Sequence, residues 1–261
     1  MFSADYRQNF NADSKTSYAK FMIGKLALGA QTYRPVGLEH NSPPDMASQR
    51  AIDSAPDPRR SEMYRTIAQL FRDRGFDATS VSEIARVLDL TKAGLYHHFE
   101  SKEALLFEIM MFGLDKVRDE VILPVQAIRD PEERLRQLIA RHARITTRGH
   151  GAVAHLQDEI RALPPSARKQ IEHRMRVYFD LVRDTLDELH AAGRLAPVDR
   201  TVATFSLIGM ILWLPRWFRL DGRLTQDQVA ENIANLALGG LITPRARQRS
   251  KSGRLLRQAQ R

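Results

Sequence analysis

The feature that most restricts the fold of this chain is the helical spacing of its apolar residues, which continues with short interruptions over residues 59–241. In the first such segment Met63, Ile67 and Phe71 follow one another at intervals of four, and Gly75 ends the run. No stretch alternates apolar and polar residues over the length of a strand. The sequence therefore predicts an all-α protein with about nine helices.

Residues with capping side chains mark where the next helices begin. Ser80 and Glu83 form a capping-box pattern, Thr91 precedes a short third helix, and Ser101 precedes a fourth. We expect Pro124 to end that fourth helix, because proline has no backbone N–H to donate. Further helices are expected at 132–147, 152–163, 166–192, 199–218 with an interruption at Pro215, and from Thr225, in a capping box with Gln228, through Leu238.

These helices divide into a compact three-helix unit with a connecting helix and a larger helical bundle. The expected parts are a disordered N-terminal extension at 1–57, a helix-turn-helix domain at 58–118 with its motif at 80–99, a bundle domain at 119–242 and a basic disordered tail at 243–261. The apolar residues of the extension show no sustained helical or strand periodicity. We hypothesise that translation starts at Met46.

Composition excludes several classes of site. The chain has no cysteine, which rules out disulfides, thiolate zinc sites and cysteine nucleophiles. Its apolar run at 202–215 is shorter than the roughly 20 residues of a membrane-spanning helix, and the stretch at 20–30 lacks a signal-peptide cleavage site, so we expect a cytoplasmic protein without a membrane partner. The net charge of +9 comes mainly from the tail at 243–261, which is either solvated or attracts DNA non-specifically.

The spacing from Ser80 to Phe99 is that of a helix-turn-helix, in which a tight turn joins a helix to a short second helix. Such a second helix fits the major groove of DNA, and its first residues reach the base edges. Lys92 can donate to guanine or phosphate, while the small Ala93 and Gly94 let the backbone approach.

The segment "TSVSEIARVLDLTKAGLYHHFESKEALL" resembles the DNA-binding segment of the tetracycline-repressor (TetR) family of bacterial transcription regulators, and the resemblance is strong over 58–118. It implies a three-helix DNA-binding domain on a helical ligand-binding and dimerising domain. It also implies that Lys92, Ala93 and Gly94 face the bases, and that Tyr96, His98 and Lys102 hold phosphates along with hydroxyls at Thr79 or Ser80. The expected DNA-binding residues are Thr79, Ser80, Thr91, Lys92, Ala93, Gly94, Tyr96, His98 and Lys102, whereas His97 has no assigned role.

One position departs from the family pattern. Where the family commonly has glycine in the turn, this chain has Asp89, and that site often needs a left-handed backbone. Aspartate tolerates this region better than other residues with a side chain, so we expect the motif to survive.

The histidine pair allows other interpretations. Adjacent positions on a helix point about 100° apart, which disfavours a metal site through His97 and His98. The segment contains no set of nucleophile, base and orienting residue, so we expect no catalytic residue, no cofactor and no metal. The structural alternative is a helix whose Leu95 and Phe99 pack inward while its polar residues are solvated.

The two most apolar helices, at 199–218 and 225–241, carry small residues such as Gly209 and Gly240 that suit packing against a second copy. A symmetric homodimer would form a four-helix bundle from them and place two recognition helices roughly 34 to 36 Å apart. The resemblance implies the same dimer interface. The alternative is that both helices form the buried core of a monomer.

Candidate ligand contacts lie at the end of the first of these helices, where the aromatic Trp213, Trp217 and Phe218 surround Arg216. This mixture suits an amphipathic, anionic small molecule. The stretch is similar to the Trp-rich segment followed by Asp-Gly-x-Leu in TetR-type regulators that sense acyl-coenzyme A thioesters. The alternative is that these aromatic side chains make core or dimer contacts.

The sequence thus predicts a homodimeric transcriptional regulator, not an enzyme, which binds a palindromic double-stranded DNA operator. Repression, with release by a small-molecule effector, is what the family resemblance implies. A helical lipid-binding or acyl-coenzyme A-binding protein or enzyme, in which the helix-turn-helix pattern is incidental, is the alternative. An architectural DNA-binding protein without a ligand is a third.

Overall fold

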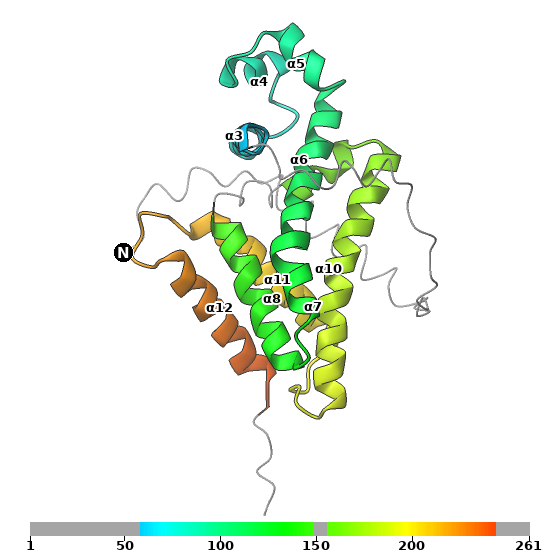
Figure 1. Ribbon diagram of the computed structural model, residues 1–261, viewed down its shortest axis with the longest axis vertical. Coiled ribbons are helices and arrows are strands. Elements are labelled where there is room, and N and C mark those ends of the chain that lie inside the picture. The colour runs from blue at the N-terminus through cyan, green and yellow to red at the C-terminus, as the bar shows by residue number, and fades with distance from the viewer. Residues whose placement is uncertain (1–57, 149–155, 244–261) are drawn as a thin grey trace, which may run out of the picture. The chain divides into compact units, whose positions relative to one another are not determined.

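The computed structural model describes residues 58–148 and 156–243, and the elements are labelled in Figure 1. This part of the chain is helical without a named β-strand, apart from an isolated antiparallel bridge between Leu195 and Ile242. The all-α prediction is confirmed. None of the helices in these two stretches combines the length and apolar character needed to cross a membrane. The extension at 1–57 and the tail after Thr243 lie outside the described residues.

The chain divides into two compact units. Within the described residues, the N-terminal unit comprises 58–116, 148 and 156–175, and the bundle unit comprises 117–147 and 176–243. The segment 148–175 groups with the N-terminal unit, although the expected domain division places it in the bundle domain. The N-terminal unit is therefore assembled from two separate stretches of chain.

The N-terminal unit contains α3 (Pro58–Arg74), α4 (Val81–Val87), α5 (Lys92–His98) and the first fifteen residues of α6 (Lys102–Val117). Its second stretch contributes the 3-10 helix η3 (Leu156–Ala162) and the beginning of α10 (Pro165–Ala191). Fully buried apolar side chains come from both stretches of the unit, among them Ile67, Phe71, Ile84, Leu105, Leu156 and Ile171. Hydrophobic burial thus stabilises the unit across its gap in sequence.

Side-chain caps define the helix-turn-helix. The Ser80 hydroxyl accepts a hydrogen bond from the Glu83 amide at 3.2 Å, and the Glu83 carboxylate accepts one from the Ser80 amide at 3.2 Å. Thr91 Oγ1 accepts from the Gly94 amide at 3.0 Å at the start of α5. Both predicted helix starts are confirmed, and each cap satisfies amides that the helix itself leaves without a partner.

The turn between α4 and α5 adopts the left-handed backbone that the sequence indicated. Asp89 has a φ of 55°, the one positive φ at a residue other than glycine in the described stretches. Its amide donates to the Arg86 carbonyl at 3.2 Å, and the Leu90 amide donates to the Ala85 carbonyl at 2.8 Å. These two bonds form a Schellman motif, which ends α4 and redirects the chain into α5.

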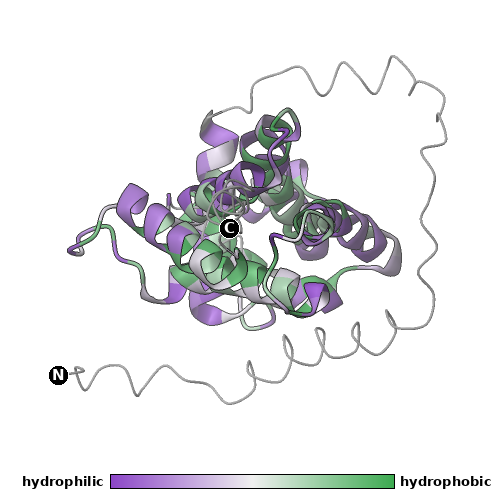
Figure 2. Ribbon diagram, turned by 90° about the horizontal axis from the view of Figure 1, so that it is seen from below, coloured by the Kyte–Doolittle hydropathy of each residue, from purple (hydrophilic) through white to green (hydrophobic). Residues whose placement is uncertain are grey.

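The bundle unit is formed by α8 (Pro131–Thr147), the part of α10 from Arg176, α11 (Arg200–Trp217) and α12 (Gln226–Leu241). Both α11 and α12 pack on α8. The helices carry hydrophilic and hydrophobic sides (Figure 2), and the hydrophobic sides meet in a core that includes Leu135, Ile139, Leu186, Ile211 and Ala234. The Thr225 capping box with Gln228 is present at the start of α12, as predicted.

Pro124 does not end the helix, contrary to the prediction. After α6 the chain forms a π-helix, η2 (Arg118–Ile122), and then α7 (Leu123–Gln126), which contains Pro124. A π-helix accommodates the proline because its wider turn removes the clash with the carbonyl four residues earlier. That carbonyl, on Glu120, accepts a hydrogen bond from Arg141 at 3.4 Å instead.

The predicted helix at 152–163 also differs from the structure. Its described part is the 3-10 helix η3 rather than an α-helix, and residues 149–155 lie outside the described residues. Short 3-10 segments are common as connectors, and the following Pro164 and Pro165 prevent elongation because neither can donate a backbone hydrogen bond. By contrast, α11 continues through Pro215 to Trp217.

Candidate functional site

The short helix α5 presents one polar, exposed side. Lys92, Ala93 and His98 are exposed, and Tyr96 exposes 52% of its surface. Leu95 and Phe99 point the other way and are buried, so the helix is anchored by its apolar side. The predicted base-facing and phosphate-facing residues of this helix are therefore accessible to a large partner.

Gly94 has a second role besides letting the helix backbone approach DNA. A methyl group in the place of its hydrogen would lie 3.2 Å from Thr91 Oγ1, the atom that caps α5. This is tighter than an ordinary van der Waals contact. Glycine therefore preserves the cap and also leaves the exposed end of the helix unobstructed.

Thr79 is not available to DNA, contrary to the prediction. Its side chain is fully buried, and its hydroxyl donates to the Gly75 carbonyl at 2.7 Å. The neighbouring Ser80 is exposed, and its hydroxyl oxygen serves the cap of α4. The sequence could not distinguish the two hydroxyls, because only the path of the turn decides which one faces inward.

Lys102, which is predicted to contact a phosphate, donates hydrogen bonds within its own unit. Its ammonium group donates to the Phe76 carbonyl at 2.9 Å and to the Thr79 carbonyl at 3.1 Å. It lies 4.2 Å from the centre of the Phe76 ring, within the range of a cation–π interaction. The side chain therefore points back into the N-terminal unit.

The two adjacent histidines pack against each other. The rings of His97 and His98 are exposed and meet edge to face with their centres 5.9 Å apart. In residues 58–148 and 156–243, no three acidic, cysteine or histidine side chains are grouped so that they could hold a metal ion. His97 shares the exposed side of α5 with Ala93, one helical turn earlier.

A second exposed surface runs along α11 and α12 of the bundle unit. Val202 and Trp213 on α11 are exposed, and Leu236 on α12 exposes 67% of its surface. An added methyl group at Gly209, Gly239 or Gly240 would touch no other atom within 4 Å. The packing of the chain itself therefore does not require glycine at these positions. The close approach of a second protein surface would require it.

The predicted ligand contacts come together at the C-terminal end of α11. The Arg216 guanidinium lies 4.6 Å from the centre of the Trp213 ring, and the rings of Trp217 and Phe218 meet edge to face at 6.5 Å. Each tryptophan exposes 46% of its surface, while the partly buried Phe218 packs on the bundle core. The cluster thus lies at the surface of the bundle unit.

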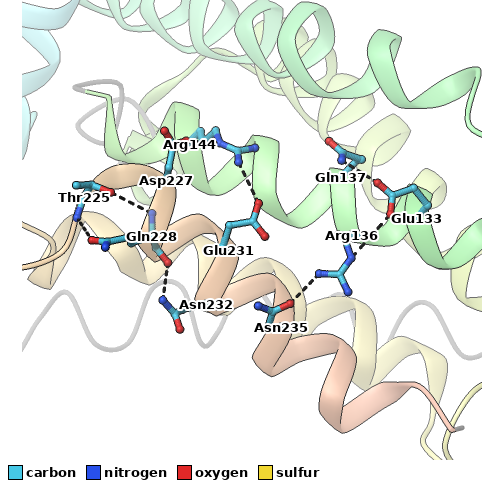
Figure 3. A network of polar contacts seen from close by, with 10 residues as sticks. All are labelled: Glu133, Arg136, Gln137, Arg144, Thr225, Asp227, Gln228, Glu231, Asn232 and Asn235. Atoms are coloured by element: carbon cyan, nitrogen blue, oxygen red, sulfur yellow. Dashed lines mark hydrogen bonds and ion pairs between the residues drawn. The ribbon is translucent and has the colours of Figure 1, made fainter.

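Polar contacts with α8 hold α12 in place (Figure 3). Arg144 bonds to Asp227 at 2.6 Å and to Glu231 at 3.2 Å, and Arg136 donates to Asn235 at 2.7 Å. Helix α12 is therefore fixed on α8 both by these polar contacts and by its apolar side, which lies in the core. This leaves Leu236 and the glycines facing away from the chain's own core.

The bundle unit contains a buried polar pair that was not predicted from the sequence. His142 on α8 and Tyr178 on α10 lie 2.8 Å apart, and their rings meet edge to face. Burial lowers the pKa of His142 to about 4 and raises the pKa of the Tyr178 hydroxyl. The residues are 36 positions apart, so no local pattern signals their pairing.

Comparisons with known proteins agree with this geometry. Residues 64–109 match the family described as bacterial regulatory proteins, tetR family, and residues 129–241 match the tetracyclin repressor-like C-terminal domain. The HTH-type transcriptional repressor KstR2 of Rhodococcus jostii (strain RHA1) is 30% identical over 188 residues, which cover 71% of this chain and 92% of the relative.

Solved structures are similar along most of their own length. AibR, crystallised in complex with isovaleryl coenzyme A and operator DNA, is 38% identical with a TM-score of 0.62, over 68% of this chain and 97% of that one. The ketosteroid transcriptional regulator KstR2 of Mycobacterium tuberculosis is 28% identical with a TM-score of 0.66, over 73% and 98% of the respective chains.

Proposed function

Because this chain belongs to the TetR family of bacterial transcriptional regulators, we propose that it is a repressor that a small-molecule effector releases from its operator. The observation that carries the proposal is the exposed side of α5, where Lys92, Ala93, Tyr96 and His98 stand on a capped helix anchored by buried apolar residues. A protein that acts on the bacterial chromosome is expected in the cytoplasm.

The polar side of α5 suits the major groove. The Lys92 ammonium can donate to guanine or to a phosphate, and the Ala93 methyl group can contact a thymine methyl. Tyr96 and His98 carry donors that reach phosphates, which fix the register without reading sequence. Thr91 and Gly94 complete the helix start, where backbone amides favour an anion.

A homodimer follows from the exposed surface on α11 and α12. A second copy would cover Val202 and Leu236, and would make use of the space beside the glycines of α11 and α12. Two copies related by a two-fold axis read a palindrome, since each presents the same helix to one half-site.

An acyl-coenzyme A thioester is the proposed class of effector. Support comes from the similarity to AibR, which was crystallised with isovaleryl coenzyme A. The cluster at the end of α11 has suitable chemistry, because the Arg216 guanidinium can pair with a phosphate and Trp213 or Trp217 can stack on a nucleobase. Phe218 offers an apolar contact beside them.

Release requires that effector and operator prefer different conformations. If the effector binds better to a dimer whose recognition helices do not match the operator spacing, each ligand lowers the affinity of the other by the same factor. The related proteins are regulators, and we propose that this chain likewise has no catalytic role of its own.

A gel-shift experiment tests the function. Full-length protein is mixed with its own promoter and with duplexes selected from random DNA, with and without isovaleryl coenzyme A. We expect binding that Lys92→Ala weakens at least tenfold and that the thioester reverses. Thioester binding without any Lys92-dependent DNA binding would support a helical acyl-coenzyme A-binding protein instead. DNA binding that no thioester reverses would point to an architectural protein.

A further inference from the structure

A cluster of three polar side chains joins α3 to α6 inside the N-terminal unit. The Tyr64 hydroxyl donates a hydrogen bond to Glu108 Oε2 at 2.5 Å and accepts one from Arg60 Nε at 2.6 Å. A second nitrogen of the same guanidinium donates to Glu108 Oε2 at 2.6 Å. Each member of this Tyr64 cluster therefore bonds to both others, and the carboxylate on α6 is held from two points on α3.

The ring of Tyr64 extends from this cluster to the end of the recognition helix. Its centre lies 6.4 Å from that of Phe99, the residue that caps the end of α5, and 5.4 Å from that of Phe112 on α6. Both distances are in the range of interacting aromatic rings, and all three side chains are buried. Because Phe112 follows Glu108 by one helical turn, Tyr64 contacts two successive turns of α6 as well as α5.

We propose that Tyr64 is a positioning residue for operator binding, which fixes α5 relative to α6 through its hydrogen bond to Glu108 and its ring contacts. The inference rests on the proposed function, because it concerns the helix that is proposed to read the operator. Tyr64 does not itself meet DNA, since only 5% of its surface is exposed. Its effect passes through Phe99, which directly follows His98 in the chain.

The hydroxyl distinguishes this residue from the phenylalanines that fill the same core, such as Phe71 and Phe76. A buried phenol costs free energy unless it is hydrogen-bonded, so filling space alone would favour phenylalanine. Burial raises the pKa of Tyr64 to about 12, so the hydroxyl keeps its proton and donates at neutral pH. Apolar contacts have no preferred direction, whereas hydrogen bonds do. The Tyr64 cluster therefore restricts the position of α6 along α3 more narrowly than the rings alone.

Two substitutions separate the hydroxyl from other roles. Tyr64→Phe removes the hydroxyl and keeps the ring, while Glu108→Met removes its acceptor on α6. Arg60 stays unchanged, because 57% of its side chain is exposed and a cation there also attracts phosphates. The matched control is Tyr178→Phe, which removes the buried hydroxyl beside His142 in the bundle unit and alters no contact of α3 or α5.

Affinities of the full-length proteins are measured by fluorescence anisotropy with two duplexes of equal length, one selected from random DNA by the wild type and one of scrambled sequence. A displaced recognition helix weakens specific binding alone, because non-specific binding depends on backbone charge. We expect Tyr64→Phe to weaken binding to the selected duplex about fivefold to tenfold, and to the scrambled duplex less than about twofold. Tyr178→Phe should leave both affinities within about twofold of wild type.

The variant that combines Tyr64→Phe with Glu108→Met tests the hydrogen bond between the two residues. It should bind the selected duplex no more weakly than the weaker single variant, since both changes remove the same bond. Losses that add would overturn the role of this bond. An equal loss with both duplexes would show a loss of folded protein, and a loss no greater than that of Tyr178→Phe would show no special role. Either result overturns the inference.

A further measurement needs no DNA. The Phe99 amide donates to the Leu95 carbonyl at 3.1 Å in the last turn of α5. Hydrogen exchange of the amides at 96–99 should be at least about fivefold faster in Tyr64→Phe than in wild type, and unchanged in Tyr178→Phe. Unchanged exchange in Tyr64→Phe would overturn the inference.

If Tyr64→Phe does not fold, Glu108→Met, which leaves the Tyr64 ring in place, is used for it in both the affinity and the exchange measurements. Should the wild type bind no DNA, the proposed function fails. The exchange data still decide in that case whether Tyr64 fixes the end of α5.

Discussion

His142 Nδ1 lies 2.8 Å from the Tyr178 hydroxyl oxygen, and both side chains are buried in the bundle unit. The imidazole is neutral in this environment, since burial lowers its pKa to about 4 from an ordinary value of about 6.5. An unfolded chain regains the ordinary pKa. The pair therefore links the stability of the bundle to pH.

The first prediction concerns that linkage. Between pH 6.5 and about 4 the unfolded chain binds a proton that folded His142 does not, so stability is retained above this window and falls as pH decreases through it. From pH 7.5 to pH 5 the loss is about 2 kcal/mol. Urea unfolding of wild type and His142→Gln at both pH values measures it. Equal pH dependence in the two proteins would contradict the assignment.

A second prediction concerns the left-handed turn at Asp89. Asp89→Gly should be neutral or stabilise the protein by a few tenths of a kcal/mol, because glycine adopts a positive φ without steric cost. Asp89→Val should destabilise it by about 1–2 kcal/mol, since a β-branched side chain is strained there. Thermal unfolding compares both variants with wild type. Loss of folding in Asp89→Gly would mean that the turn is misplaced.

The dimer surface provides a third prediction. Gly239→Leu has open space around it within one chain, so the folded protomer should form normally, whereas a second copy packed there should be pushed away. We expect monomers in sedimentation experiments and operator binding weakened at least tenfold. The exposed Ala191→Leu, at the end of α10 in the bundle unit, serves as the control. A dimer unaffected by Gly239→Leu would place the interface elsewhere.

A fourth prediction uses the fact that the chain has two tryptophans, Trp213 and Trp217, both in the proposed effector site. Tryptophan emission, excited at a wavelength that tyrosine does not absorb, therefore reports on this cluster alone. Titration with isovaleryl coenzyme A should shift or quench the emission, and Arg216→Ala should weaken the apparent affinity about tenfold by removing a charged partner for phosphate. Trp213→Phe and Trp217→Phe separate the two signals. A thioester that binds by calorimetry without changing the emission would exclude this site.

Local features of the fold were predictable from the sequence. The caps at Ser80, Thr91 and Thr225 depend on side chains and amides within three residues of each other, and all are present. The backbone of Asp89 likewise followed from its place in the turn. The apolar period of the long helices follows from the same short-range rules.

Features that depend on distant partners were not predictable. Lys102 has a suitable donor for DNA, but tertiary packing gives it the Phe76 carbonyl, 26 positions earlier in the chain. The sequence predicts a helix end at Pro124 because neither the π-turn nor the donor from Arg141 leaves a sequence signature. The pairing of His142 with Tyr178 arises in the same way from two helices that meet only in the fold.

The division of the N-terminal unit between 58–116 and 148–175 has a consequence for chimaeric regulators. Leu156 and Ile160 of η3 are buried in that unit, and Glu159 accepts a hydrogen bond from the Phe76 amide at 3.5 Å, directly before the helix-turn-helix. A recombinant protein that exchanges only the first stretch with a relative would join a foreign surface to η3. A graft that transfers operator specificity intact should carry both stretches, because their buried side chains belong to one compact unit.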